Sequence, residues 1–411
     1  MKAQRLPLPV LGIDLLSDET GLPEGAVRRA ENVDVRRNGG FSRRPGYEVV
    51  VGGADFQALY RTSRGVLVVR SGRLYAINMQ SYDLMLLCDL GGVEPVDFTE
   101  HNGNLYFGNT SSLWWVPADR SSPRRVGVAL PTSLPTVTAH PSGALPAGRY
   151  TVAVSRVDDR GEESPTKVVG QVDLPTGGGV RLSGMVPDVD AAVRVYLTPP
   201  DGDALYLSET FSAAFAEFIV SRPPDGAVRS TQHLVPLPPG EFIRGHAGRL
   251  YVARGDTVFF SEPLRPHLHD PRHNFIKFVG PVRFMESVTG GVFVGDDRGV
   301  WFLPGNEPEQ IRRATGVRAI HRSSVLVPGA HFDKNITQSD QDCAVWLSEE
   351  GYMLGRATGD TVSLHPERVR VAAALEGRSR FIVREGMKQI ITLTAATTAN
   401  GFGVATDTTL Q

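Results

Sequence analysis

Cysteine is scarce in this sequence: its 411 residues include only Cys88 and Cys343. Two cysteines so far apart do not make a disulfide framework, and each lies in an apolar run, so we interpret both as buried free thiols. Long apolar runs are also lacking, since none approaches the roughly 20 residues that a helix needs to cross a bilayer. Residues 1–7 lack the apolar core of a signal peptide. We therefore expect a protein made in a reducing cytoplasm, without membrane insertion.

Lysine is rare as well, with only five residues, so nearly all cationic side chains are arginine. The formal net charge is −2, which excludes the global basic field that drives non-specific DNA binding. Arginine forms bidentate pairs with carboxylates, which suits permanent interfaces. A GC-rich genome would produce the same bias, and surface ion pairs contribute little to stability. The charge pattern leaves both interpretations open.

Long helical patterns are missing too, because proline or glycine interrupts most windows of a dozen residues. The best helical candidate, residues 188–192, is too short to form a stable helix. The sequence has instead 44 glycines, 29 prolines and 41% hydrophobic residues, a composition typical of many short strands around real cores. We predict an all-β protein.

The stretch 248–305 sets the pattern for the rest of the chain. It contains four short apolar runs, each opened or closed by glycine or proline, which predict an antiparallel meander. The first run begins with Gly248-Arg-Leu-Tyr251, and the same Gly-x-Leu-Tyr motif starts at Gly72 and Gly103. An antiparallel unit that recurs, and needs neighbours to cover its faces, is typical of a β-propeller blade. We predict a β-propeller.

A chain of this length is expected to form two or three domains. Residues 1–50 form a segment of loops and one hairpin. Residues 51–131 and 229–411 alternate strand and turn as propeller blades do, and a strand starting at 401–404 would close the ring. Residues 132–228, inserted between blades, resemble a fibronectin type III-like or immunoglobulin-like β-sandwich. The resemblance lies in Ala147-Gly-Arg-Tyr150, Glu163-Ser-Pro165 and Arg194-Val-Tyr196.

The hairpin near the N-terminus carries the densest basic cluster in the chain. Asn38-Gly-Gly40 predicts a turn after a strand at 30–35, and a further strand is expected at 48–51. One interpretation is a contact for a partner protein or a nucleic acid backbone, and the other is a solvated hairpin tip. The candidate interface residues of this segment are Arg36, Arg37, Arg43, Arg44 and Tyr47.

Trp114 and Trp115 are adjacent on a predicted strand, so their side chains point to opposite faces. We expect one of them to lie in the core between blades. The other is interpreted as packing against the next blade or a subunit, with an exposed ligand platform as the alternative. Both are candidate interface residues.

One pattern suggests a metal site. His267, His269, Asp270 and His273 are close enough for N/O ligation, but prolines mark the segment as a connecting loop, with no zincin-like glutamate and no cysteine ligand. The nucleophile elbow, the P-loop and the dinucleotide fingerprint are absent, and paired carboxylates fall in turns. We predict no metal, no cofactor and no enzyme activity.

Three groups of segments, read together and in order, resemble the propeller-containing tail nozzle, or tail stabilisation, proteins of short-tailed bacteriophages. Each segment alone is mostly strand-and-turn chemistry, and the order gives the resemblance its specificity. The segments are Gly21-Leu-Pro-Glu-Gly-Ala26, Glu31-Asn-Val-Asp-Val35 and Arg43-Arg-Pro-Gly-Tyr47; then Phe260-Ser-Glu-Pro-Leu264, Asp270, Asn274-Phe-Ile-Lys-Phe278, Gly291-Val-Phe-Val-Gly295 and Phe302-Leu-Pro-Gly305; then Val345-Trp-Leu-Ser-Glu-Glu-Gly351, Gly355 and Gly359-Asp-Thr-Val-Ser-Leu364.

The resemblance implies a structural protein of the virion tail, assembled in the cytoplasm of the bacterial host. A nozzle is a ring of one chain, typically six copies, below the portal and adaptor, and it extends the channel through which DNA leaves. Expected partners are the chain itself, adaptor and portal-proximal proteins, and tail fibre or spike proteins. Genomic DNA would pass without tight binding, because a channel wall should avoid gripping phosphates. The inserted domain departs from the simplest pattern of the family.

Other functions remain open. The chain could be a propeller-type receptor-binding or fibre-attachment component of a phage tail that recognises host-surface glycan or protein. It could also be a related protein of a long-tailed phage or prophage. A propeller hydrolase is a further hypothesis, and the missing catalytic motifs weaken it.

Overall fold

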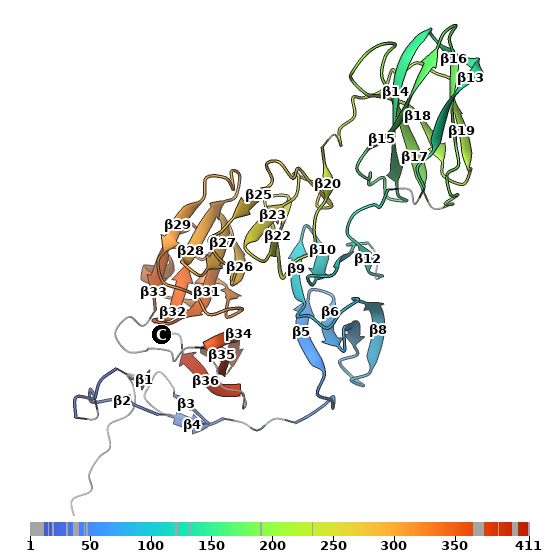
Figure 1. The fold of residues 1–411 in the computed structure, drawn as a ribbon. Helices are drawn as coiled ribbons and strands as arrows, with labels where there is room; N and C mark the ends of the chain where they lie inside the picture. The colour runs from blue at the N-terminus through green and yellow to red at the C-terminus, as the bar shows by residue number, and fades with distance from the viewer. Residues whose placement is uncertain are drawn as a thin grey trace, which may run out of the picture. The chain divides into compact units, whose positions relative to one another are not determined.

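The computed structural model is built almost wholly of β-strands and divides into two compact units (Figure 1). The first comprises residues 1–123, 239–258 and 276–411, and the second comprises 124–238 and 259–275. In the described residues the only helical turns are η1 (Gly329–His331) and α1 (Lys334–Thr337), and no helix is long and apolar enough to span a membrane. The all-β prediction is confirmed. The described residues are 12–14, 16–18, 20–29, 32–35, 41–44, 46, 48–119, 122–130, 133–189, 191–231, 233–364, 374–384, 386–396 and 402–409.

Antiparallel sheets recur in the first unit, and in each the strands are arranged in chain order. Three four-stranded sheets lie wholly in this unit: β5 (Phe56–Thr62), β6 (Gly65–Arg70), β7 (Arg73–Ile77) and β8 (Leu84–Asp89); β26 (Phe284–Val288), β27 (Gly291–Asp296), β28 (Gly299–Pro304) and β29 (Arg312–Thr315); and β30 (Val325–Val327), β31 (Cys343–Ser348), β32 (Gly351–Gly355) and β33 (Thr361–Ser363). Parts of two more sheets are β9 (Asp97–His101), β10 (Asn104–Gly108) and β11 (Leu113–Val116), and β21 (Phe242–His246) and β22 (Arg249–Arg254). The last sheet contains β34 (Ala374–Arg384), β35 (Met387–Ala396) and β36 (Phe402–Thr409).

The Gly-x-Leu-Tyr motif forms a tight hairpin at each of its three positions. The two residues between the paired strands have positive φ angles, from 47° to 76°, as type I′ turns require. These pairs are Ser71-Gly72, Asn102-Gly103 and Ala247-Gly248. The leucine that follows is buried each time, so the sequence repeat is a repeated hairpin with an inward leucine. It opens the third strand of the β5–β8 sheet but the second strand of the other two.

The first strands of six sheets line one cavity of about 670 Å³. Its lining residues belong to β5, β9, β21, β26, β30 and β34 or lie beside them. Consecutive antiparallel sheets around a common centre form a β-propeller, which confirms the predicted fold class. The stretch 248–305 is not a single meander, however, because its first runs and its last runs lie in different sheets. The pattern of apolar runs along the sequence does not show which strands pair in one sheet and which belong to the neighbouring sheet.

Gly295 lies where the sheets β26–β29 and β30–β33 pack together. A Cβ at this position would lie 2.4 Å from Cε1 of Phe284, whose ring is held by stacking on Trp346 with centroids 5.1 Å apart. Both rings are fully buried, so neither can move aside. We expect Gly295→Ala to lower the free energy of unfolding by about 1–3 kcal/mol, measured by urea denaturation. The control Gly52→Ala, where a Cβ meets nothing within 4 Å, should change it by less than about 0.5 kcal/mol. Equal losses would contradict this packing.

The N-terminal part contributes two short strand pairs to the first unit. β1 (Gly12–Ile13) pairs in parallel with β2 (Ala26–Val27). β3 (Val33–Val35), within the strand predicted at 30–35, pairs antiparallel with β4 (Phe41–Arg43), where no strand was predicted. The Oδ1 atom of Asp34 accepts a hydrogen bond from Nε2 of Gln389 on β35 at 3.4 Å, and both residues are buried. The strand predicted at 48–51 is wrong: this segment is irregular, with Val49 71% exposed. A strand near the C-terminus, β36, is present as predicted, but it pairs with β35 in the last sheet instead of completing a blade begun near the N-terminus.

Two antiparallel sheets share one hydrophobic core in the second unit (Figure 1). One contains β13 (Thr136–Leu145), β16 (Gly178–Ser183) and β19 (Glu217–Val220); the other contains β15 (Lys167–Leu174), β14 (Gly148–Val157), β17 (Ala192–Leu197) and β18 (Tyr206–Ser212). The unit includes the range 132–228 predicted as the inserted domain, and its relation to fibronectin type III or immunoglobulin domains stays a prediction. Short strands β12 (Arg124–Arg125), β20 (Val235–Pro236) and β24 (Leu268–His269) belong to this unit, and β23 (Thr257–Phe260) and β25 (Phe275–Lys277) lie at the division between the units.

Candidate functional site

Arg244 on β21 is held between two carboxylates in the wall of the propeller cavity. Its Nη1 lies 2.6 Å from Oδ2 of Asp97 on β9. Its Nε and Nη2 bind Glu286 on β26 in a bidentate pair, at 3.1 and 3.0 Å. The backbone N–H of Ile243 also donates to Asp97, and Ser324 Oγ donates to Glu286. One guanidinium therefore joins three sheets.

The network sets one guanidinium against two carboxylates. Burial opposes the charge of Arg244, but the carboxylates of Asp97 and Glu286 outweigh it and raise the pKa of the guanidinium. Burial also raises the pKa of Tyr60, which lines the same cavity, to about 12, so the phenol stays protonated. An arginine fixed by two carboxylates is suited to holding strands in place rather than to moving protons.

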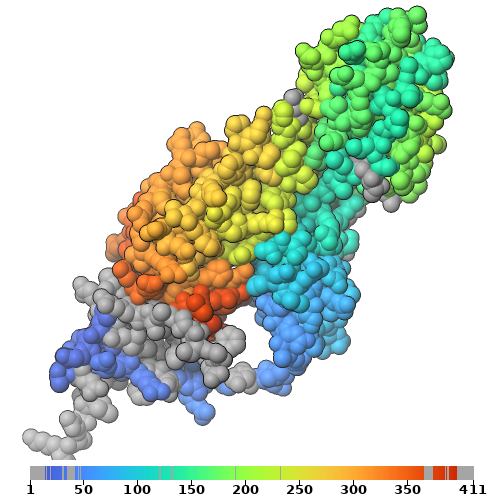
Figure 2. Space-filling view, in the orientation of Figure 1, coloured from blue at the N-terminus to red at the C-terminus, as the bar shows by residue number. Residues whose placement is uncertain are grey.

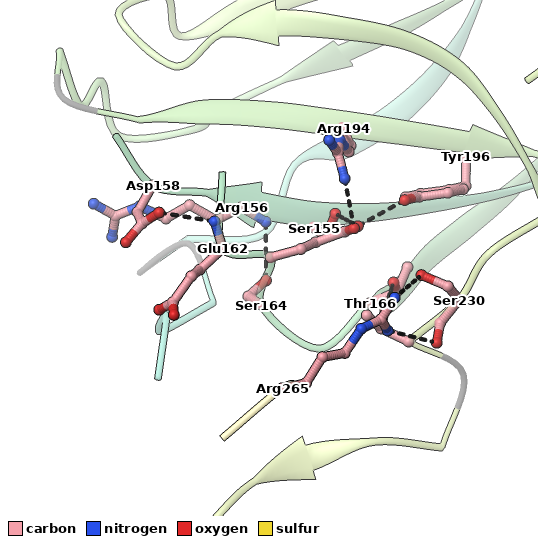
Figure 3. Close-up of polar contacts among 12 residues, drawn as sticks. Ser155, Arg156, Asp158, Glu162, Ser164, Thr166, Arg194, Tyr196, Ser230 and Arg265 are labelled. Atoms are coloured by element: carbon pink, nitrogen blue, oxygen red, sulfur yellow. Dashed lines mark hydrogen bonds and ion pairs between the residues drawn. The ribbon is translucent and has the colours of Figure 1, made fainter. Parts of the chain in front are cut away.

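Glu163 is the centre of a second polar cluster, in the second unit. Its carboxylate accepts hydrogen bonds from the hydroxyl of Tyr196 at 2.6 Å, from Nη1 of Arg194 at 2.7 Å and from Oγ of Ser155. Figure 3 shows these three side chains converging from β14 and β17. Glu163 is 9% exposed, so its acceptors are largely used within the protein. Burial and the bond to Glu163 raise the pKa of Tyr196, which keeps its donor proton in place.

The segment that contains His267, His269, Asp270 and His273 packs against the backbone at Glu163. His267 is buried, with Nε2 3.2 Å from the backbone oxygen of Glu163 and Nδ1 3.8 Å from Oε1 of Glu162. Asp270 is paired with Arg272 at 2.7 Å rather than with a histidine. Burial lowers the pKa of His267 and of His269. Within the described ranges, no group of three or more His, Cys, Asp and Glu side chains is placed to hold a metal ion.

Glu162 gives the second unit a pH dependence. Burial, and then the charge of Asp158, raises the pKa of Glu162 from 4.5 to about 7, against the opposing charges of Arg160 and Arg124. The folded state therefore holds a proton between these values that the unfolded state has released, so stability falls as pH rises from about 4.5 to about 7. We expect Glu162→Gln to gain stability relative to wild type across this window, measured by urea denaturation at a series of pH values.

The contribution of His267 to stability depends on pH in the opposite direction. Because its pKa is lowered in the folded state, stability falls as pH falls below 6.5. The comparison of Glu162→Gln with wild type isolates the carboxyl group, since His267 is present in both proteins. The control Glu217→Gln changes an exposed carboxylate of the same unit, paired with Arg181. A pH-independent difference between Glu162→Gln and wild type would contradict the assignment.

Two of the basic candidate interface residues lie in the described hairpin. Nε of Arg44 lies 2.9 Å from Oδ1 of Asp34, whose side chain is 3% exposed, so Arg44 compensates a buried charge. Arg43, at the end of β4, is exposed to solvent. The positions Arg36, Arg37 and Tyr47 lie outside the described residues, and so does the predicted turn at 38–40.

Neither candidate tryptophan forms an exposed platform. Trp115 is 7% exposed and stacks on Tyr106, with ring centroids 6.0 Å apart. Trp114 is half-buried against the core between the β5–β8 and β9–β11 sheets, and its indole N–H donates to Ser112 Oγ at 2.9 Å. The adjacent pair does point to opposite faces, as predicted, and both faces are covered.

Comparison with known proteins gives fold likenesses only. No protein-family model matches the chain, and no curated protein matches it. Saccharomyces cerevisiae Sqt1 is similar at 10% identity over 77% of this chain and 85% of that chain, with a TM-score of 0.23. Kluyveromyces lactis Hsv2p is similar at 8% identity over 87% of this chain and 98% of that chain, with a TM-score of 0.32. The N-terminal domain of Nup159 is similar at 10% identity over 83% of this chain and 73% of that chain, with a TM-score of 0.29. TM-scores this low add no argument about fold or function.

The residues of the cavity network were missed in the sequence. Asp97, Arg244 and Glu286 each stand in a short strand, where an isolated charge usually indicates a solvent-facing position. β9 and β21 each end two residues before a Gly-x-Leu-Tyr motif. The motif alone does not mark them as first strands, because at Gly72 the same motif opens a third strand.

Proposed function

We propose that this chain is a structural protein of a short-tailed phage virion, a subunit of the nozzle ring that extends the DNA-exit channel of the tail. The proposal starts from the ordered segments that resemble this family. It is supported by what those segments do in the fold, where their polar side chains form bonds that fix loops and sheets. Shape-determining residues are what a subunit of a rigid ring requires.

The observation that carries the proposal is the loop 259–275 of the second unit. Three of the segments that carry the resemblance are hydrogen-bonded to one another in this loop. Nδ2 of Asn274 donates to Oε1 of Glu262 at 2.6 Å. The N–H of Asn274 donates to the carbonyl of Asp270 at 2.8 Å. The N–H of Phe260 donates to the carbonyl of Asn274 at 3.1 Å. These bonds close the loop and present His267 to Glu163. The residues that carry the resemblance thus have a structural role in this loop, which supports the proposal.

A ring needs a lateral surface, and the outer strand β8 offers one. Met85 and Leu86 on this strand are 63% and 55% exposed, and Met79 beside it is 57% exposed. Figure 2 shows this sheet, coloured blue, at the surface of the molecule. Apolar side chains grouped on an edge strand are typical of a surface that a partner covers. We assign this edge to the contact with a second copy of the chain.

The proposal is tested on virions and on the purified protein. Purified virions should contain the chain, and virions assembled without it should lose their DNA. In negative-stain images the protein should form rings, and Met85→Lys/Leu86→Lys should abolish them. The control Val189→Lys changes an apolar residue of the second unit that is 80% exposed. Absence from virions, or a deletion that leaves heads full and infective, would overturn the proposed function.

A receptor-binding component is the alternative function, and its aromatic platform has no support in the described tryptophans.

The nozzle function also predicts weak, unspecific contact with DNA. The purified chain should bind duplex DNA poorly at physiological salt, and a tight, steeply salt-dependent affinity would count against a channel wall that lets DNA slide.

A further inference from the structure

Three further arginines line the propeller cavity beside Arg244. Arg322, Arg378 and Arg380 all line the cavity, the last two on β34. The side chain of Arg322 is only 5% exposed. Its nearest carboxylate oxygens, on Glu241 and Glu376, are each 3.9 Å away, which is beyond hydrogen-bond range. A buried guanidinium without a hydrogen-bonded carboxylate is unusual, because burying a charge is costly unless it is paired.

Apart from its two ion pairs at 3.9 Å, Arg322 is held by contacts that carry no full negative charge. Nε donates to Nε2 of His321 at 3.1 Å, and the guanidinium carbon lies 5.1 Å from the ring centroid of Phe242. Its own backbone N–H donates to the carbonyl of Arg283 at 2.8 Å. Neither a neutral imidazole nor an aromatic ring carries a full negative charge. The guanidinium is therefore held rigidly at the cavity wall, ready to meet an anion.

Two more arginines line the cavity with Arg322. Arg378 is paired with Glu376 at 2.8 Å, and Arg380 is exposed on β34. Asp97 and Glu286 are hydrogen-bonded to Arg244, and the charge of Asp97 also favours the cationic form of Arg322. Burial and the charges of Arg322, Arg283 and Arg378 lower the pKa of His321 to about 4, which agrees with a positive local field. Three arginines face two glutamates here, Glu241 and Glu376.

We propose that this arginine wall binds an oxyanion, the phosphate or carboxylate group of a small molecule. The planar fork of Arg322 matches two oxygens of such a group, and the two arginines of β34 add charge beside it. A cavity of about 670 Å³ is in the size range of small-molecule sites. The site goes beyond the proposed nozzle function and does not depend on it.

Titration of the full chain with inorganic phosphate, and separately with citrate, tests the site. Isothermal titration calorimetry at constant ionic strength should give saturable binding with a Kd of about 1 mM or lower for at least one of the two probes. The probe that binds shows whether the group is phosphate or carboxylate. Absence of saturable binding of either probe up to about 10 mM would overturn the proposal.

Variants then locate the binding. Arg378→Gln/Arg380→Gln removes two exposed arginines and should weaken affinity at least about tenfold. The matched control Arg73→Gln/Arg181→Gln removes two exposed, ion-paired arginines outside the cavity and should bind as wild type does. Arg322→Lys keeps the charge but loses the fork, so it should also weaken binding. Equal losses in both double variants, or no loss in the cavity variant, would show a general charge effect and overturn the site.

Discussion

Arg244→Met is expected to lower the free energy of unfolding by about 3–5 kcal/mol, because it leaves two carboxylates in the propeller cavity without their partner. The side chains of Asp97 and Glu286 are only 20% and 8% exposed, so water replaces the lost hydrogen bonds poorly. Equilibrium denaturation in urea at pH 7 measures the change.

Two variants control this experiment. Arg73→Met breaks an ion pair with Asp89 whose side chains are 55% and 65% exposed, and should cost less than about 1 kcal/mol. Adding Asp97→Asn and Glu286→Gln to Arg244→Met removes the stranded charges and should recover part of the loss. If Arg244→Met behaves like Arg73→Met, the cavity network does not hold the three sheets together.

Glu163→Leu is the second large effect, with an expected loss of about 2–4 kcal/mol in the second unit, because it leaves several buried donors unsatisfied. The hydroxyls of Tyr196 and Ser155 and the guanidinium of Arg194 all donate to this one carboxylate. Glu163→Gln keeps an acceptor for part of the set and should lose less. Differential scanning calorimetry of the full chain measures the shift of the affected transition.

The matched control is Glu217→Leu on β19, whose carboxylate is paired with Arg181 and whose side chain is 41% exposed. It should leave the transition within about 2 °C of wild type, because exposed ion pairs contribute little. If Glu163→Leu and Glu217→Leu shift the transition equally, Glu163 is not the organising residue of its cluster.

Strands that read clearly in the sequence are those with an apolar alternation and a glycine turn. β7, β10 and β22 are such strands, since each follows the glycine turn of a Gly-x-Leu-Tyr motif. Local chemistry decides these elements, since a type I′ turn and an inward leucine need no distant partner. The all-β class and the recurring hairpin were therefore predictable.

Other strands depend on partners that the sequence does not name. β13 contains His140-Pro-Ser-Gly143, which reads as a turn, yet it pairs with β16 across a register irregularity between His140 and Leu145. The charges of the cavity were missed for a related reason. Which face of a short strand points to the centre is set only when all the sheets are in place, so Arg322 and Arg244 could not be told from surface arginines.

The contact between Asp34 and Gln389 spans 355 positions of the chain. The hairpin of β3 and β4 can therefore contact β35 only after nearly the whole polypeptide has been synthesised. The seven strands of the two sheets in the core of the second unit, β13 to β19, follow one another between Thr136 and Val220 and need no such delay. Long-range pairings form slowly, so the second unit should fold on the ribosome before the propeller is complete. Until then the sheet edges of the propeller are exposed to misassociation.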